Sequence, residues 1–283
     1  MKSIGLGKIS DLKTSAIEVK PKKSLGQNFL VDENIARKIV GSLELTSEDV
    51  VVEIGPGQGA LTKYIVDNVS KLLAVEIDTR VAEKLKSEFL SKNIDIINKD
   101  FLEFDYKEIF KKYKREIRLV GNLPYHLTSP ILFKAFENRR YISDFTFMIQ
   151  KEVAQRIVGQ KGTKSYGILS VLTQFYGKPE ILFNVSSNCF YPKPKVTSTV
   201  VRLDFSEEIP YRVDAGLFKV VVKTTFGKRR KTVKNSLKYL PFDEQMNKRI
   251  IDSLDYPLQK RPEQLSIEEF VTLTNEISEI LTS

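Results

Sequence analysis

Residues Asn122 to Tyr125 form the most chemically suggestive stretch of this sequence, at the end of the mostly apolar run 117–121. The carbonyl oxygen of an asparagine side chain can accept a hydrogen bond from an exocyclic amine, and a tyrosine ring can stack on the planar base that carries the amine. Pro124 fixes its own φ and stiffens the turn, which leaves the carbonyl of Leu123 free to face outward. The pattern predicts a pocket for a base amine, and an ordinary proline turn after a strand is the alternative.

The same residues suit a reaction at such an amine. An aryl amine is a poor nucleophile because its lone pair is delocalised into the ring. Two acceptors that hold both N–H groups draw the nitrogen toward a tetrahedral form and localise this pair for attack. The side-chain oxygen of Asn122 and the backbone oxygen of Leu123 are candidate acceptors, and Tyr125 is a candidate for one flat face of the pocket.

A second candidate site begins where the predicted strand 50–54 enters the glycine-rich loop 55–59. Glycines let the backbone turn sharply and approach a ligand closely, and the helix that follows supplies unpaired N–H groups. Glu76 closes the next predicted strand, 21 positions after Gly55, where its carboxylate can accept hydrogen bonds from ribose hydroxyls. These features alone fit NAD and S-adenosylmethionine equally well.

Three further residues favour S-adenosylmethionine. Pro56 removes one loop N–H, a loss that matters more for a loop that must hold a pyrophosphate. Glu53 places a carboxylate just before the loop, which is awkward beside a dianion but acceptable near the ammonium and sulfonium groups of S-adenosylmethionine. Asp100 follows the third predicted strand and can bind an adenine amine, with a helix N-cap as its alternative role. With Asn122 these positions lie at successive strand ends, where open α/β sheets bind ligands.

Strand-like and helix-like segments alternate through most of the chain. Apolar or β-branched runs predict strands at 50–54, 72–77, 94–97, 117–120, 145–149, 181–185 and 199–203. Helical periodicity at 60–68, 81–90 and 130–139 predicts a mostly parallel sheet with helices on its faces, closed by an antiparallel pair. Amphipathic segments at 215–226, 230–239, 243–254 and 266–281 then predict a small all-α domain. We expect a catalytic domain over 1–207 and a helical RNA-recognition domain over 208–283.

Composition narrows the class of protein further. The chain has 283 residues, one cysteine (Cys189) and one histidine, so we expect no disulfide, no Cys/His zinc site and a reducing, cytoplasmic environment. No apolar run approaches the roughly 18–20 residues of a membrane span, and the first 20 residues have no apolar core of a signal peptide. We therefore expect neither a membrane partner nor a metal.

The charge of the chain points to an anionic partner. The formal net charge is +9, and residues 215–242 contain eight lysines and arginines but no Asp or Glu. This acid-free segment predicts a surface for RNA phosphates, with a solvated helix face as the alternative. Residues 188–202 also lack acids and contain Phe190, a candidate for the second flat face of the base pocket, with a core position as its alternative.

Together these motifs resemble class I S-adenosylmethionine-dependent methyltransferases and, more closely, the KsgA-type rRNA adenine N6,N6-dimethyltransferase family. The resemblance extends from about Lys22 to Leu265, nearly the whole chain. It is carried by KKSLGQNFL at 22–30, EIGPGQG at 53–59, EID at 76–78, NLPY at 122–125, FYPKPKVTS at 190–198 and FGKRRKTVKN at 226–235.

The resemblance implies a Rossmann-like fold, a cofactor site and a substrate. The cofactor contacts map to Asn28, Leu30, Gly55, Glu76, Asp100 and Asn122. The implied substrate is a pair of adjacent adenosines in a hairpin loop near the 3′ end of 16S rRNA, in the 30S subunit or its precursor. Each adenosine would be dimethylated during subunit assembly, by a protein that acts as a monomer.

Three other functions stay open at this point. A large-subunit rRNA adenine methyltransferase of the macrolide-resistance type shares the fold and the methyl-transfer site, but its tail lacks a segment like 229–231. An RNA-binding assembly factor with vestigial catalytic machinery is disfavoured by the intact Glu76 and Asn122. An NAD-dependent dehydrogenase is disfavoured because no catalytic His or Lys constellation is apparent.

Overall fold

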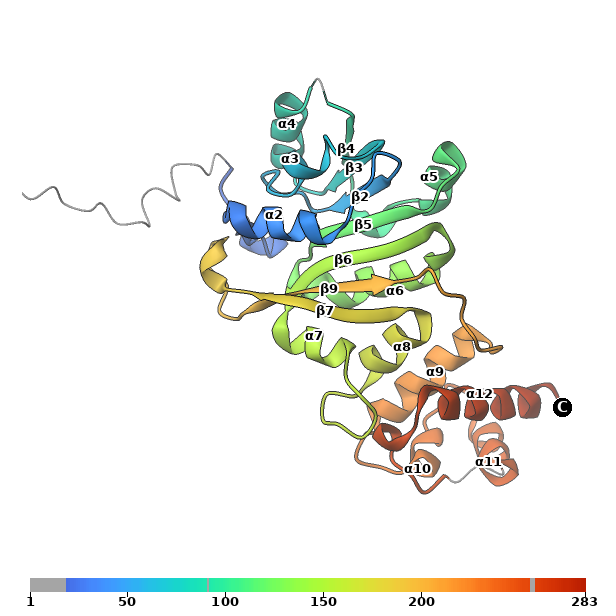
Figure 1. Ribbon diagram of the computed structural model, residues 1–283. Coiled ribbons are helices and arrows are strands. Elements are labelled where there is room, and N and C mark those ends of the chain that lie inside the picture. Colours follow the sequence, from blue (N-terminus) through green and yellow to red (C-terminus); the bar gives the residue numbers. More distant parts are fainter. Residues whose placement is uncertain (1–18, 91, 255–257) are drawn as a thin grey trace, which may run out of the picture. The chain divides into compact units, whose positions relative to one another are not determined.

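The computed structural model describes residues 19–90, 92–254 and 258–283. A seven-stranded sheet has the strand order β4-β3-β2-β5-β6-β9-β7 (Figure 1). Its strands are β2 (Val50–Ile54), β3 (Lys71–Glu76), β4 (Ile94–Asn98), β5 (Ile117–Asn122), β6 (Ile142–Gln150), β7 (Lys178–Val185) and β9 (Ser198–Asp204). Each of them overlaps a strand predicted from the sequence, and the predicted α/β fold class is confirmed.

The strands β2 to β6 run parallel. The chain proceeds outward from β2 through β3 and β4 and then returns to β5 on the other side of β2. Strand order therefore reverses at β2, and open α/β sheets bind ligands outside the carboxyl ends of the strands at such a point. At the far end of the order, β9 runs back beside β7 as the predicted antiparallel strand (Figure 1).

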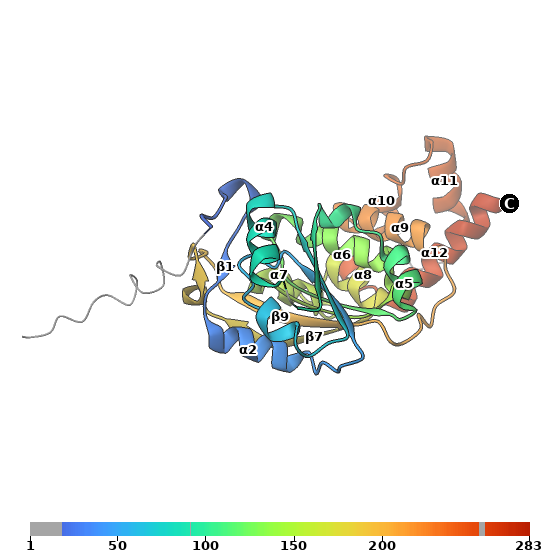
Figure 2. The same ribbon diagram turned by 90° about the horizontal axis from the view of Figure 1, so that it is seen from above.

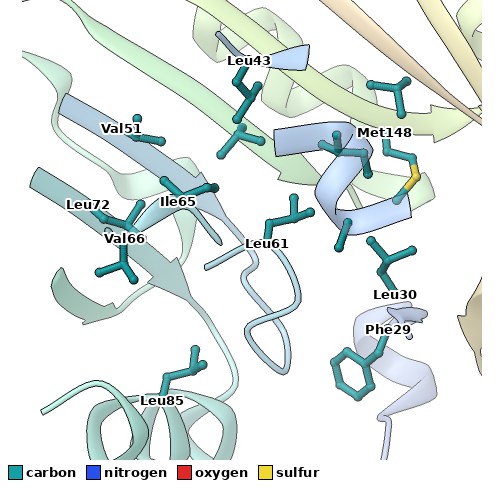
Figure 3. Close-up of a cluster of buried hydrophobic side chains, with 14 of the residues drawn as sticks. Phe29, Leu30, Leu43, Val51, Leu61, Ile65, Val66, Leu72, Leu85 and Met148 are labelled. Atoms are coloured by element: carbon teal, nitrogen blue, oxygen red, sulfur yellow. The ribbon is translucent and has the colours of Figure 1, made fainter. Parts of the chain in front are cut away.

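The central strand β2 is buried along its whole length, as expected for a parallel strand that is covered on both faces. Val51 packs in one apolar cluster with Leu72 of β3 and Met148 of β6 (Figure 3). The helices α2 (Glu33–Ser42), α3 (Thr62–Ile65) and α4 (Thr79–Glu88) contribute side chains to the same cluster. These three helices therefore cover one face of the sheet.

Helix α3 is one turn long and shorter than the predicted 60–68 helix. Polar side chains bond to the backbone just beyond its end. The Asn68 amide donates to the Tyr64 carbonyl at 2.8 Å, and the Ser70 hydroxyl donates to the Asp49 carbonyl at 2.7 Å. The Asn68 bond is local and competes with helical bonds, whereas the Ser70 bond ties the chain to Asp49 just before β2. The chain therefore leaves the helix and enters β3.

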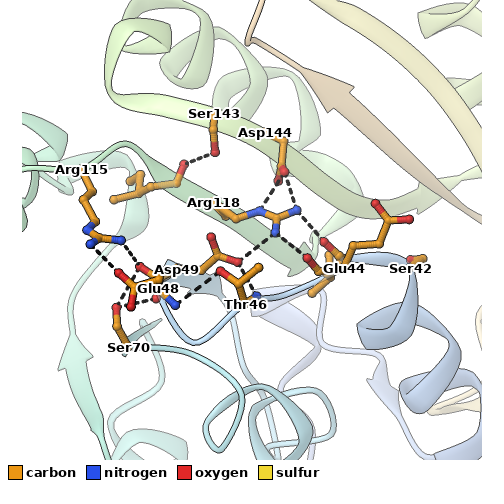
Figure 4. Close-up of polar contacts among 12 residues, drawn as sticks. Ser42, Glu44, Thr46, Glu48, Asp49, Ser70, Arg115, Arg118, Ser143 and Asp144 are labelled. Carbon is orange, nitrogen blue, oxygen red and sulfur yellow. Dashed lines mark hydrogen bonds and ion pairs between the residues drawn. The ribbon is translucent and has the colours of Figure 1, made fainter.

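Arg118 on β5 joins three segments at the amino end of the sheet (Figure 4). Its guanidinium lies 2.6 Å from the Asp144 carboxylate on β6 and 3.0 Å from the Asp49 carboxylate before β2. It also donates to the backbone carbonyls of Leu43 and Glu44. Only 16% of the side chain is exposed, so this network holds β5, β6 and the entrance to β2 in register.

The other α-helices in the described part of the chain are α5 (Tyr106–Tyr113), α6 (Thr128–Glu137), α7 (Lys151–Ile157), α8 (Ile168–Tyr176), α9 (Ala215–Gly227), α10 (Val233–Leu237), α11 (Glu244–Ser253) and α12 (Ile267–Thr282). The last four confirm the predicted helical tail and gather together in both views (Figures 1 and 2). All four start at an N-cap residue whose side chain accepts a backbone N–H, and these residues are Asp214, Thr232, Asp243 and Ser266.

Contacts divide the chain into two compact units. Of the described residues, the first unit contains those up to 151 with 182–202, and the second contains those of 152–181 and 203–283. Within the second unit the Phe175 ring of α8 stacks on Phe218 of α9, with centroids 4.2 Å apart, and the Tyr166 hydroxyl donates to the Leu265 carbonyl at 2.9 Å. Segment 152–181 therefore groups with the C-terminal helices. The functional boundary at 207/208 stays a prediction.

Within residues 19–90, 92–254 and 258–283, no helix combines the length and apolar character that crossing a membrane requires. The same residues contain no group of three or more His, Cys, Asp or Glu side chains arranged to hold a metal ion.

Candidate active site

One pocket in the first unit opens at the carboxyl ends of β2, β3 and β5. The empty space of this pocket, including the part open to solvent, is about 830 Å³. The predicted site residues that line it are Asn28, Gly55, Glu76, Asp100, Asn122, Leu123 and Tyr125. The fold thus brings together residues that lie nearly a hundred positions apart in the sequence.

The glycine-rich loop lies against the pocket with its backbone in the left-handed region. Gly55 has φ +62° and Gly57 has φ +55°, conformations that glycine adopts without the strain that a Cβ would add. A Cβ on Gly57 would lie 2.9 Å from Cδ1 of the Phe29 ring. Both the turn and the close approach of the loop to residue 29 therefore require glycine at 57.

Glu76 faces the pocket from the end of β3 and is only 4% exposed. One carboxylate oxygen accepts from the Asp78 N–H at 2.9 Å and the other from the Gly57 N–H at 3.3 Å. Burial raises the pKa of this carboxyl. Each carboxylate oxygen has more than one acceptor position, so the side chain can bind the two hydroxyls of a ribose while it also shapes the loop.

Glu53 lies behind the loop, 1% exposed, and accepts from the Thr62 hydroxyl at 2.7 Å. Burial raises the pKa of Glu53 to about 7. Its side chain borders a smaller neighbouring cavity together with Leu30, Gly55 and Asn122. A cation in this region would favour the ionised form of Glu53, which suits a ligand that carries an ammonium group.

Asp100 has the capping role that was its alternative and also lines the pocket. Its carboxylate accepts from the Leu102 N–H at 2.8 Å and so caps the short 3-10 turn η2 (Phe101–Glu103). The same residue lines the pocket beside Ile77, an apolar side chain that is 49% exposed. A flat base can therefore meet an apolar surface and a hydrogen-bond acceptor here.

The Asn122 side chain is oriented by the N-terminal segment. Its amide nitrogen donates to the backbone carbonyl of Asn28 at 2.9 Å. Because that partner is an acceptor, the NH₂ group must face it, and the Asn122 carbonyl oxygen is left for a ligand. Leu123 is buried, and its N–H donates to the Met148 carbonyl at 3.1 Å, which anchors the turn to β6.

Tyr125 begins the 3-10 turn η3 (Tyr125–Leu127) and is half-buried at the pocket. Its hydroxyl lies 2.9 Å from the Ser198 hydroxyl at the start of β9. This bond restrains the ring, and burial raises the pKa of the Tyr125 phenol. His126 is exposed and does not line the pocket.

A tether that sequence reasoning missed holds the N-terminal segment to the pocket. The buried Asp78 carboxylate lies 2.6 Å from Arg80 and 3.3 Å from Lys22, and it accepts from the Gln27 amide at 3.2 Å. The Arg80 guanidinium holds the pKa of Asp78 well below its usual range. Gln27 and Lys22 lie 51 and 56 positions from Asp78, so no local pattern predicts the contact, although its two sides lie in the motifs at 22–30 and 76–78.

Two predicted residues do not line the large pocket. Leu30 and Phe190 face each other in a short antiparallel ladder between β1 (Phe29–Leu30) and β8 (Phe190–Tyr191). Phe190 is 4% exposed and belongs to the apolar core cluster. The structure thus places Phe190 in the core position that was its alternative, and its assignment to a base face stays a prediction.

The basic segment 228–238 of the second unit is mostly exposed. Arg230, Lys231, Lys234 and Lys238 are exposed, whereas Val233 and Leu237 are buried. Arg229 differs from its neighbours, because its guanidinium donates to the backbone carbonyls of Thr163 and Lys164 at 3.2 and 3.0 Å. Arg229 therefore holds a loop of its own unit, a role that its place in a charge run did not predict.

The strand order and the pocket together define a class I methyltransferase. The donor set fits S-adenosyl-L-methionine, since Glu76 and Asp100 are placed for a ribose and a base, and Glu53 for a cation. Pro56 and Glu53 leave the loop poorly suited to a pyrophosphate.

Comparisons with known proteins give the family. The family model described as ribosomal RNA adenine dimethylase matches residues 18–279, and the chain belongs to this family. It is an S-adenosyl-L-methionine-dependent rRNA adenine dimethyltransferase.

Relatives agree with this membership, and solved structures share the fold. Ribosomal RNA small subunit methyltransferase A of Flavobacterium johnsoniae is 44% identical over 92% of this chain and 97% of the relative. The Bacteroides thetaiotaomicron protein of the same name is 43% identical over 93% of this chain and 96% of the relative. A dimethyladenosine transferase from Plasmodium falciparum shares the fold, with a TM-score of 0.75 at 22% identity over 88% of this chain and 97% of that one. The 23S rRNA methyltransferase ErmE has a TM-score of 0.63 at 26% identity, over 89% of this chain and 100% of the ErmE chain.

Proposed function

We propose that this enzyme dimethylates the N6 amines of two adjacent adenosines in a hairpin loop near the 3′ end of 16S rRNA, during assembly of the 30S subunit. The orientation of Asn122, with its carbonyl oxygen available in a pocket for a nucleoside cofactor, is the observation that carries the proposal. The names of the relatives from Flavobacterium and Bacteroides support the small subunit as the source of the substrate. A cytoplasmic, monomeric enzyme is part of the same proposal.

The cofactor supplies a methyl group on a sulfonium, which needs no further activation by the protein. Asn28, Leu30, Gly55, Glu76, Asp100 and Asn122 are the residues that we assign to hold it. The protein then has to bring the amine to the methyl group and to prepare its lone pair. In our proposal the Asn122 and Leu123 oxygens accept from the two N–H groups, and Tyr125 stacks on the adenine. Positioning and preorganised acceptors account for such catalysis without a covalent intermediate.

No general base is required of this site. The lone pair of the amine forms the new N–C bond, and the nitrogen becomes acidic once it carries the additional methyl group. The proton can then leave to water, which fits a pocket that is open to solvent. His126 is exposed outside the pocket lining, so we assign it no part in proton transfer.

We assign the basic segment 228–238 to the phosphates of the rRNA. Arg230, Lys234 and Lys238 are exposed on it, and counterion release from phosphates would drive this contact. Arg229 is left out of the assignment because its guanidinium already binds two carbonyls.

Methylation of two kinds of ribosomal particle, together with a measurement of particle binding, tests the proposal. Purified 30S particles and 50S particles that lack the modification are incubated with the enzyme and cofactor, and the rRNA nucleosides are separated by mass spectrometry. We expect N6,N6-dimethyladenosine in 16S rRNA only. Product confined to 23S rRNA would instead establish the large-subunit function, for which the likeness to ErmE is the supporting observation. Absence of product together with particle binding would establish a non-catalytic assembly factor.

A further inference from the structure

Tyr239 is an exposed aromatic side chain surrounded by lysines. Its surface is 49% exposed. The Lys228 ammonium lies 4.3 Å from the ring centroid and the Lys231 ammonium 5.4 Å. Lys231 also donates a hydrogen bond to the Tyr239 hydroxyl at 3.2 Å. Two cations thus restrain a ring that remains open to solvent.

The charges around this ring are not balanced by acids. Residues 215–242 contain no Asp or Glu, and in the part of the chain that the structure describes neither Lys228 nor Lys231 has a carboxylate partner. The hydrogen bond from Lys231 lowers the pKa of the Tyr239 phenol, and the charges of Lys231, Lys228 and Lys238 add to this effect. Like charges close together repel each other, and an anion between them would relieve the repulsion.

The ligand chemistry that fits both features is that of a nucleotide. A phosphate would neutralise the lysines, and a base would cover the exposed ring, since any base can stack on an aromatic side chain. A protein carboxylate would satisfy the charges but would leave the flat ring uncovered. A cation–π contact at an exposed site is weaker than base–aromatic stacking, so a base can displace Lys228 from the ring toward the phosphate.

We propose that Tyr239, Lys228 and Lys231 form a binding site for one unpaired nucleotide of the rRNA, with the base stacked on Tyr239 and its phosphate held by the two lysines. This site rests on the proposed function, because it takes rRNA as the partner of the basic segment. It adds a contact through the base, which the phosphate surface alone does not include.

The sequence contains no tryptophan, so a Tyr239→Trp variant has a single indole, placed at the proposed site. Titration with 16S rRNA should quench its fluorescence as a base stacks on it. Tyr113 on α5 offers a matched control, because its ring also lies beside a lysine, with Lys112 at 5.1 Å. A Tyr113→Trp variant should show no comparable quenching.

Binding measurements across a salt series separate stacking from charge. Tyr239→Ala should weaken rRNA binding roughly 5- to 150-fold, the range for one stacked base, without changing the log–log salt slope. Tyr239→Phe should bind like the wild type. Lys228→Ala and Lys231→Ala should each lower the slope by about 0.7–0.9. Far-ultraviolet circular dichroism checks that the helices of each variant remain folded.

Several results would overturn this site. Wild-type affinity of Tyr239→Ala, or equal quenching of the two tryptophan variants, would exclude stacking at Tyr239 even if the lysine variants still lower the slope. Competition by inorganic polyphosphate as strong as that by an oligonucleotide of equal charge would mean that the lysines bind phosphate alone. If the wild-type protein shows no salt-dependent binding to 16S rRNA, the assignment of the basic segment to rRNA phosphates fails together with the Tyr239 site. This result differs from a failure of the Tyr239 site alone, in which the wild-type protein still binds rRNA in a salt-dependent manner.

Discussion

Replacing Asn122 by alanine tests the arrangement that we propose for the amine. The substitution removes the side-chain oxygen that would accept from the adenine N–H. It also removes the hydrogen bond to the Asn28 carbonyl, which is 2.9 Å long in the intact protein. The two losses should affect different measurements, since Asn28 lines the cofactor pocket, whereas we propose that the free oxygen acts in the reaction itself.

The expected loss of rate is roughly an order of magnitude or more larger than the expected loss of cofactor affinity. A hydrogen bond between neutral groups contributes about 0.5–1.5 kcal/mol, so the dissociation constant of S-adenosylmethionine should rise about 2- to 12-fold. Loss of one preorganised group at a reacting centre costs about 10²–10³-fold in rate. The rate of methyl transfer at saturating cofactor and rRNA should therefore fall by at least about 10²-fold.

Single-turnover methyl transfer and calorimetry of cofactor binding measure the two effects separately. Asn28→Ala is the matched control, because it keeps the backbone carbonyl that Asn122 contacts and should leave the saturated rate near that of the wild type. His126→Ala, at an exposed position outside the pocket lining, should also react normally. A saturated rate of Asn122→Ala within a few-fold of the wild type would refute the role of Asn122 in preparing the amine.

Three further predictions concern the cofactor site and stability. Glu76→Ala should weaken S-adenosylmethionine binding in calorimetry by about 1–3 kcal/mol, and unchanged affinity would contradict the ribose contact. The variant should also have a lower melting temperature, since the backbone N–H groups of Gly57 and Asp78 lose their acceptor. Burial raises the pKa of Glu53 to about 7 in the folded protein, from 4.5 for an ordinary glutamate. The contribution of Glu53 to stability is therefore fully present below pH 4.5 and is lost as the pH rises through 7. Glu53→Gln should therefore gain stability over the wild type, on the order of 3 kcal/mol at pH 8, but little at pH 4, and a pH-independent difference in urea unfolding would refute this. Arg118→Ala should lower the free energy of unfolding by about 3 kcal/mol, since it leaves two carboxylates without their partner. Arg115 forms a half-exposed ion pair with Glu48, so Arg115→Ala should lower the free energy of unfolding by at most about 1 kcal/mol. Equal losses for the two arginine variants would show that burial does not determine how much an ion pair contributes to stability.

The strands and the site that they carry were predictable because their signals are local. A buried parallel strand is read from a mostly apolar run such as 50–54. The glycines that follow this run mark positions where the backbone can take positive φ. Since parallel strands end at the same edge of a sheet, Glu76, Asp100 and Asn122 could be expected in one pocket, and each of them lines it. The buried face of the helical tail followed in the same way from helical spacing.

Other features depend on contacts between distant residues, which no local pattern reports. The strands β1 and β8 have two residues each and exist because Leu30 pairs with Phe190, 160 positions away. This ladder buries Phe190, although its basic, proline-rich surroundings suggested an accessible ring.

Charge patterns also left the partners of individual side chains undetermined. The sequence by itself determined the acid-free character of 215–242, and hence the anionic partner that we expect. Only the tertiary structure decided that Arg229 serves a loop of its own unit and that Tyr239 gathers two lysines. The physical reason is that net charge is a sum over residue types, whereas a hydrogen bond or a cation–π contact requires specific atoms within a few ångströms.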